Sequence, residues 1–193
     1  MKTFAVMLVG LCFLLAPKLG TGEMVAMSDS ELSAVTAGGF SSFSLTNDGT
    51  FDIAKAMFNV QAETFTEIES MKLAHWDNGS GTPGWDQNWT GVDMGTSAEN
   101  LVLKDFVMET TFTNVNDPQN RELESVTIGF NNVTGTMSAD FQSLSRLTGT
   151  QYENRQNEGP ATYQFNGDKL LLTINVKGDN RGIWVDMGDA LKK

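Results

Sequence analysis

The stretch YQFNGDKLLLTINV, residues 163–176, decides the fold class of this chain of 193 residues. Leu170, Leu172, Ile174 and Val176 share one face of an extended strand, and this period of two marks a half-buried β-strand. Asn166-Gly167 is the strongest short signal for a β-hairpin turn. After the turn residues 178–182, Ile183, Val185 and Met187 alternate again. Residues 159–193 are therefore predicted to form an antiparallel meander of three strands.

Working back towards residue 40, short runs of Thr, Val, Phe and Ile are separated by Gly, Asn and Asp. Alternation over residues 126–130 and 133–141 predicts further strands, and a strand is also favoured over residues 58–73. The alternation slips at Lys104-Asp105, where we expect a β-bulge or a tight turn. Residues 142–158 are polar and predict a loop with one helical turn. We expect one mainly β domain over residues 40–193, an antiparallel β-sandwich or β-roll.

The first 26 residues have the pattern of a secretory signal peptide. Lys2 precedes the uncharged apolar run of residues 4–16, which is too short to span a membrane comfortably. Cleavage could follow Gly20, Gly22 or Ala26. Cys12, the one cysteine, lies inside this segment, so the mature chain would carry no disulfide and no thiolate metal ligand. An exported chain without disulfides favours a bacterial source.

Residues 27–39 predict a short capped helix. Ser28 and Glu31 form a capping box, Leu32 and Val35 share a face, and Gly38 or Gly39 can provide a stop. A helix of about two turns is not stable alone. It must dock on the rest of the protein or be removed by processing after Gly38.

The charge of the chain is strongly acidic, with a net charge of −11. Removal of residues up to Gly22 would take away Lys2 and Lys18 and leave −13. Nucleic-acid binding requires clustered Lys and Arg, which the sequence lacks. Attraction to an anionic membrane surface is disfavoured for the same reason, and no membrane-spanning segment is expected after cleavage of the signal peptide.

Enzymatic signatures are weak throughout the chain. His75 is the only histidine and no Gly-x-Ser-x-Gly motif accompanies it. Residues 79–84 match Gly-x-Gly-x-x-Gly, but Pro83 removes a backbone donor and no apolar helix follows. The acidic pairs Glu67/Glu69 and Glu122/Glu124 have strand spacing and predict a solvated face. We expect no catalytic residue, no metal site and no cofactor.

Tryptophans and carboxylates gather within fourteen residues and form the candidate ligand-binding set: Trp76, Asp77, Trp85, Asp86 and Trp89. Three interpretations stay open. The indoles could cover one end of the core, they could stack on sugar rings of a glycan or cell-surface component, or Asp77, Asn78 and Asp86 could hold Ca²⁺ in a loop.

Two families resemble residues 27–39. Double-glycine leaders of bacteriocin type align with Ser28, Glu31, Leu32 and Val35 if cleavage follows Gly38, although Ala37 replaces the penultimate glycine. A second set is favoured: poorly characterised exported β-rich proteins of Gram-negative bacteria that carry a signal peptide and an "ELSxVTxxG" segment, a domain of unknown function. Glu31-Leu32-Ser33, Val35-Thr36 and Gly39 match this segment, and Ala37 departs from the Gly-Gln that the family tends to have. This resemblance implies location and architecture.

The sequence predicts a secreted or outer-surface protein with a structural or adhesive role. Self-association by strand addition between subunits, or contact with cell-surface components, is the favoured mode of action. A monomeric carbohydrate- or calcium-binding module using residues 76–89 is the alternative, and a leader-processed peptide precursor is a second one. Location in the periplasm stays open.

Overall fold

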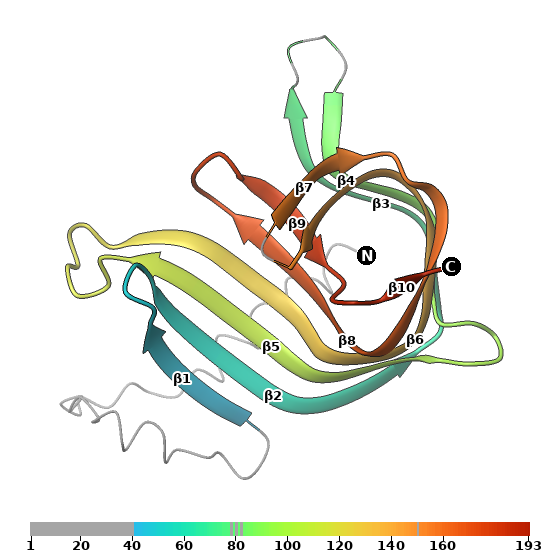
Figure 1. The fold of residues 1–193 in the computed structure, drawn as a ribbon, viewed down its shortest axis with the longest axis horizontal. Coiled ribbons are helices and arrows are strands. Elements are labelled where there is room, and N and C mark those ends of the chain that lie inside the picture. The colour runs from blue at the N-terminus through green and yellow to red at the C-terminus, as the bar shows by residue number, and fades with distance from the viewer. Residues whose placement is uncertain (1–40, 78, 80, 82, 150) are drawn as a thin grey trace, which may run out of the picture.

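A computed structural model describes residues 41–193 of the chain apart from 78, 80, 82 and 150. In this part the chain forms ten β-strands and no helix (Figure 1). The mainly β prediction is confirmed. The predicted signal peptide 1–26, the capped helix 27–39 and the processing candidates Gly22, Ala26 and Gly38 lie outside the described residues. The strands are β1 (Ser41–Asn47), β2 (Asp52–Thr64), β3 (Thr66–Asp77), β4 (Pro83–Met94), β5 (Leu101–Thr113), β6 (Glu122–Thr148), β7 (Gln151–Gln156), β8 (Gly159–Asn175), β9 (Gly182–Asp186) and β10 (Leu191–Lys192).

β6 is the strand around which the fold is built. It has 27 residues. Its first half pairs with β5 and its second half with β4, while β8 pairs along most of its other side. Because one strand serves three long partners, all ten strands join a single sheet that curls on itself (Figure 1). The ladders are antiparallel except for one parallel bridge between β6 and β9.

The hairpin predicted at Asn166-Gly167 is wrong, and the turn before β9 is confirmed. Residues 163–170 belong to one continuous strand, β8, which keeps pairing with β6 on both sides of a register shift opposite Val133. Gly167 has φ +86°, so the glycine serves a bulge inside the strand. The chain does not reverse here because β6 is long enough to pair with β8 on both sides of the bulge. After residue 175 the chain does turn, and Asn175 pairs with Gly182 of β9.

The irregularity at Lys104-Asp105 is confirmed as a bulge. The register with β2 shifts here: Phe58 pairs with Phe106 and Gln61 with Lys104, so that two residues of β2 lie opposite Asp105, which has φ +58°. The ladder of β5 with β6 keeps its register at this point. Strand structure over residues 58–73 is also confirmed, in β2 and β3.

The loop predicted over residues 142–158 is wrong. β6 runs on to Thr148 and β7 follows, because alternate side chains such as Leu144 reach the core. A polar segment can extend when only one of its faces has to be buried.

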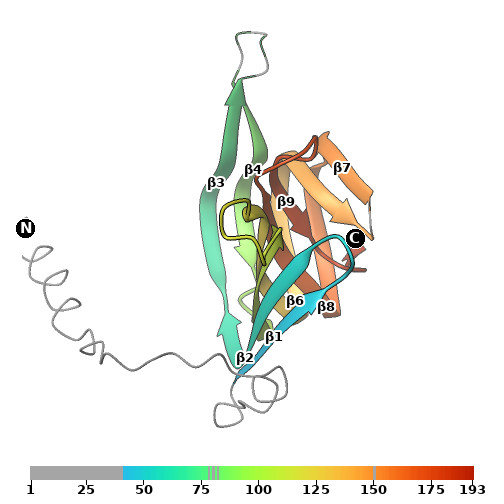
Figure 2. The ribbon, with the colours of Figure 1, turned by 90° about the vertical axis from the view of Figure 1, so that its left-hand side faces the viewer.

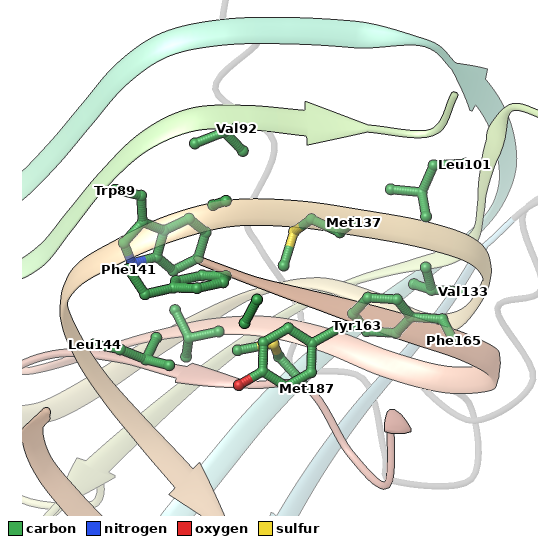
Figure 3. Close-up of a cluster of buried hydrophobic side chains, with 13 residues drawn as sticks. Trp89, Val92, Leu101, Val133, Met137, Phe141, Leu144, Tyr163, Phe165 and Met187 are labelled. Carbon is green, nitrogen blue, oxygen red and sulfur yellow. The ribbon is translucent and has the colours of Figure 1, made fainter. Parts of the chain in front are cut away.

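The core lies inside the tightly curled half of the sheet (Figure 3). Trp89 of β4 packs edge-on against Phe141 of β6, with ring centroids 5.0 Å apart, and Phe141 packs in the same way against Tyr163 of β8. Full burial of side chains of this size contributes about 1.5–3 kcal/mol each. The interlocked rings therefore hold β4, β6 and β8 in the curl.

Candidate functional site

The predicted tryptophan-rich site lies on the β3–β4 hairpin, which projects from the rest of the sheet (Figure 2). Trp76 of β3 pairs with Gly84 of β4, and a Cβ on Gly84 would come within 2.3 Å of the indole. The indole thus lies over the glycine backbone and covers the neighbouring strand. The His75 and Trp85 rings meet edge-on at 4.9 Å.

Two members of the predicted set are buried. Trp89 is 3% exposed and belongs to the core, while Asp86 is 3% exposed and its Oδ2 accepts a hydrogen bond of 2.9 Å from the backbone N–H of Ile183. Between them Gln87 is fully buried. Its Nε2 donates to the carbonyl oxygens of Ser145 and Ile183, and its Oε1 accepts from Trp89 Nε1. These side chains tie β4 to β6 and β9.

The structure therefore does not bring the five residues to one surface. Trp76 and Trp85 are half-buried on the hairpin, and Asp77 is exposed, with its Oδ1 accepting a hydrogen bond from the Gly79 backbone. Over the described residues, no three His, Cys, Asp or Glu side chains gather in a way that could hold a metal ion. The acidic pair Glu122/Glu124 shares one partner, the ammonium of Lys177.

A polar network that the sequence did not reveal joins β6, β7, β8 and β10. Arg146 Nε lies 2.5 Å from Glu153 Oε2, and Arg146 Nη1 lies 3.3 Å from Glu158 Oε1. Tyr163 donates its O–H to Glu158 Oε2, which also accepts from Lys192 Nζ at 3.1 Å.

The electrostatics of this network follow from its geometry. Burial alone would raise the pKa of Glu158, but the hydrogen bonds from Tyr163 and Lys192 and the charge of Arg146 outweigh burial and lower it below its ordinary value. Burial and the neighbouring Glu158 carboxylate raise the pKa of the Tyr163 phenol. Every charge in the network has a partner, which fits a structural role in fastening strands together.

The open half of the sheet carries apolar side chains on one of its faces. Directly paired residues project to the same face. One such row begins at solvent on β1 and ends in the core on β9, across six strands: Phe43, Ala56, Met108, Ile128, Leu172 and Val185. A neighbouring row on the same face contains Leu45 and Ile174.

Five large side chains of this face are exposed, and we call them the open apolar face: Phe43, Leu45, Phe58, Met108 and Ile174, at 47%, 55%, 36%, 43% and 36% exposure. Monomeric soluble proteins rarely expose contiguous apolar patches larger than a few hundred Å², so this face is a candidate interaction site. The alternation Phe43-Ser-Leu45 in the sequence was the available signal for its outer end.

Within the described residues, the strand at the border of this face is an unprotected edge. In the described part of the chain β1 pairs with β2 alone, so its other side presents free backbone groups. Its seven residues, SSFSLTN, include no charge and no proline. Natural edge strands are usually blunted by such residues or by bulges. β3, which pairs only with β4 in the described part, carries the charged residues Glu67, Glu69 and Lys72 along it, and its regular extended backbone is interrupted at Ala74, which has φ +55°.

Comparison of the chain with known protein-family models, with curated proteins and with solved structures found no match. Among the described residues no helix is long and apolar enough to cross a membrane.

Proposed function

We propose that this chain is an exported, non-enzymatic β-protein of structural or adhesive type that self-associates by adding β1 of one copy to β1 of a second copy. The observation that supports this proposal is the unprotected apolar edge of β1. Export to the cell surface or medium rests on the signal-peptide pattern of residues 1–26, and the ELSxVTxxG resemblance supports the same location. We propose a β-roll as the form of the curled sheet.

A second copy fits the β1 edge because the strand is complementary to itself. In an antiparallel pairing centred on Ser44, Phe43 of each copy lies directly opposite Leu45 of the other. Four apolar side chains then meet on one face, and each pair would be of the kind that contributes about 0.2–1 kcal/mol to a sheet. Such a contact is isologous, so it closes as a two-fold dimer.

The pairing also continues the apolar surface. Since Phe43 and Leu45 lie on the open apolar face, the faces of both copies fall on the same side of the joined sheet. The curl of each copy is directed to that side, so the two faces help to cover one another. The glycan- and calcium-binding alternatives would need Trp89 and Asp86 at the surface, and both side chains are buried.

Sedimentation velocity over a range of protein concentrations tests the proposal. The wild-type protein should show a monomer–dimer equilibrium, and Leu45→Lys should weaken it by about tenfold or more, because a charge on the edge strand must be desolvated on pairing. Leu191→Lys is the matched control: Leu191 is 71% exposed on β10, at the other end of the strand order from β1. Its dimerisation should stay within about twofold of wild type, since surface substitutions away from an interface have small effects.

Circular dichroism of each variant verifies that the sheet is intact. A wild-type protein that stays monomeric at every concentration would overturn the proposal. Equal weakening by both lysine variants would also overturn it, since association would then not depend on β1.

A further inference from the structure

An apolar cavity of about 370 Å³, open to solvent on one side, lies between the β3–β4 hairpin and the β5, β6 and β8 strands. Its wall includes Met71 and Leu73 of β3, Met94 of β4, Phe130 of β6, and Leu170 and Leu172 of β8. Among the described residues, no charged side chain lines it. The one polar side-chain atom of these lining residues is Trp89 Nε1, which already donates to Gln87 Oε1.

The apolar side chains of the wall favour a hydrocarbon ligand over water or a sugar. Water needs two to four polar partners in a buried site, and the hydroxyls of a sugar need at least as many. The side chains of the described wall offer no free polar group for either. A saturated hydrocarbon chain needs no polar partner, and three methionines, Met71, Met94 and Met137, can adapt to its shape.

The cavity has room for one hydrocarbon chain. A methylene group takes up about as much space as a water molecule, about 30 Å³. The cavity of about 370 Å³ therefore holds about a dozen methylene groups. It falls within the range of about 300–1,000 Å³ that is usual for small-molecule sites.

A continuous aromatic path connects the cavity with solvent. Phe130 and Phe106 line the cavity and meet at a centroid distance of 5.4 Å. Phe106 in turn meets Phe58 of the open apolar face at 6.0 Å. A chain lying along this path would place its polar end near the exposed Phe58, outside the apolar wall.

We propose that the cavity binds the alkyl chain of a single-chain amphiphile of about a dozen carbons, with the headgroup in solvent beside Phe58. The net charge of −11 disfavours an anionic headgroup and therefore favours a neutral one. This inference goes beyond the self-association proposed above and does not depend on it.

The experiment uses dodecanol and a terminally brominated dodecanol, both below the concentration at which they aggregate. Trp89 lines the cavity, so the brominated chain should quench tryptophan fluorescence and the plain chain should not. Lengthening the alcohol up to about twelve carbons should tighten binding by up to about fourfold per methylene, and longer chains should gain little. Dodecanoate at low salt should bind more weakly than dodecanol.

Two matched double variants locate the site. I128F/L172F changes a directly paired couple inside the cavity, whereas V126F/I174F changes the neighbouring couple outside its wall. The larger side chains take up space that about two methylene groups of the ligand would fill, so the first variant should bind dodecanol about tenfold more weakly. The second should retain binding. Thermal unfolding verifies that both fold.

Several outcomes would overturn the proposal. Absence of bromine quenching, or equal loss of binding in both double variants, would remove the cavity as the site. Probe affinity that falls as protein concentration rises would assign the cavity to a second copy. Binding only after removal of residues 1–39 would assign it to the chain's own N-terminal segment. The variant Leu45→Lys should bind dodecanol normally, so a failure of self-association leaves this test intact.

Discussion

At the residue scale, Gln87 shows how a polar side chain can specify a β-core. It is fully buried and uses both ends of its amide, donating to two carbonyl oxygens on β6 and β9 and accepting from the Trp89 indole. A buried amide that satisfies three groups fixes the relative position of three strands more narrowly than an apolar side chain of the same size could.

The substitution Gln87→Leu tests this role. Leucine conserves the volume, but it leaves the indole N–H and two carbonyl groups without these partners, and each buried polar group left unpaired costs about 1–3 kcal/mol. We expect the free energy of unfolding in urea to fall by about 2–4 kcal/mol. Gln61→Leu, at an exposed position on β2, is the control and should change it by less than about 0.5 kcal/mol. Similar values for the two variants would contradict the role assigned to Gln87.

The candidate site around Gln87 could be predicted from the sequence only in part. The sequence shows Trp85, Asp86 and Trp89 as neighbours, but a strand sends successive side chains to opposite faces. Which face is buried depends on the partner strands, and the β6 residues that pair with β4 lie more than forty residues further along the chain. Composition alone therefore could not distinguish a tryptophan that stacks on a ligand from one that packs on Phe141.

At the element scale, strand signals are readable from the sequence and strand lengths are not. Local sequence signals predict the irregularity at Lys104-Asp105 and the turn before β9, and both are present. Asn166-Gly167 has the same local chemistry as a hairpin turn, yet β8 continues through it because 27-residue β6 offers a partner on both sides. Local chemistry fixes where a chain can bend, and the available partner decides whether it reverses.

The Glu158 carboxylate acts at this scale, because it fastens β6, β8 and β10 through Arg146, Tyr163 and Lys192. Its pKa in the folded protein is lowered, so its contribution to stability is present above its ordinary pKa of 4.5 and is lost as the pH falls through the lowered value. We expect Glu158→Gln to be less stable than wild type at neutral pH, and the difference to shrink in acid.

Urea unfolding at a series of pH values measures this difference. Glu67→Gln, on the exposed edge strand β3, is the control and should differ from wild type by no more than about 0.5 kcal/mol at neutral pH. A difference for Glu158→Gln that stays constant or grows as the pH falls below 4.5 would contradict a lowered pKa for this carboxyl group.

At the scale of the whole molecule, two opposing features govern association. The net charge of −11 makes two copies repel one another at long range, whereas the β1 edge and the open apolar face attract at contact and carry no charged side chain of their own. Salt weakens the long-range repulsion, since the screening length falls from about 30 Å at 0.01 M to about 3 Å at 1 M ionic strength. The attraction between uncharged surfaces at contact stays in place.

Self-association should therefore strengthen as salt is added. We expect the dimer dissociation constant from sedimentation velocity to fall by about tenfold or more between 0.01 M and 1 M sodium chloride, because removal of repulsion between two strongly acidic bodies is worth about 1–2 kcal/mol. A dimer held by ion pairs would show the reverse trend and dissociate in salt. The salt dependence thus discriminates between an uncharged strand edge and a charged surface as the place where two copies meet, and Leu45→Lys should remain weaker than wild type at every salt concentration.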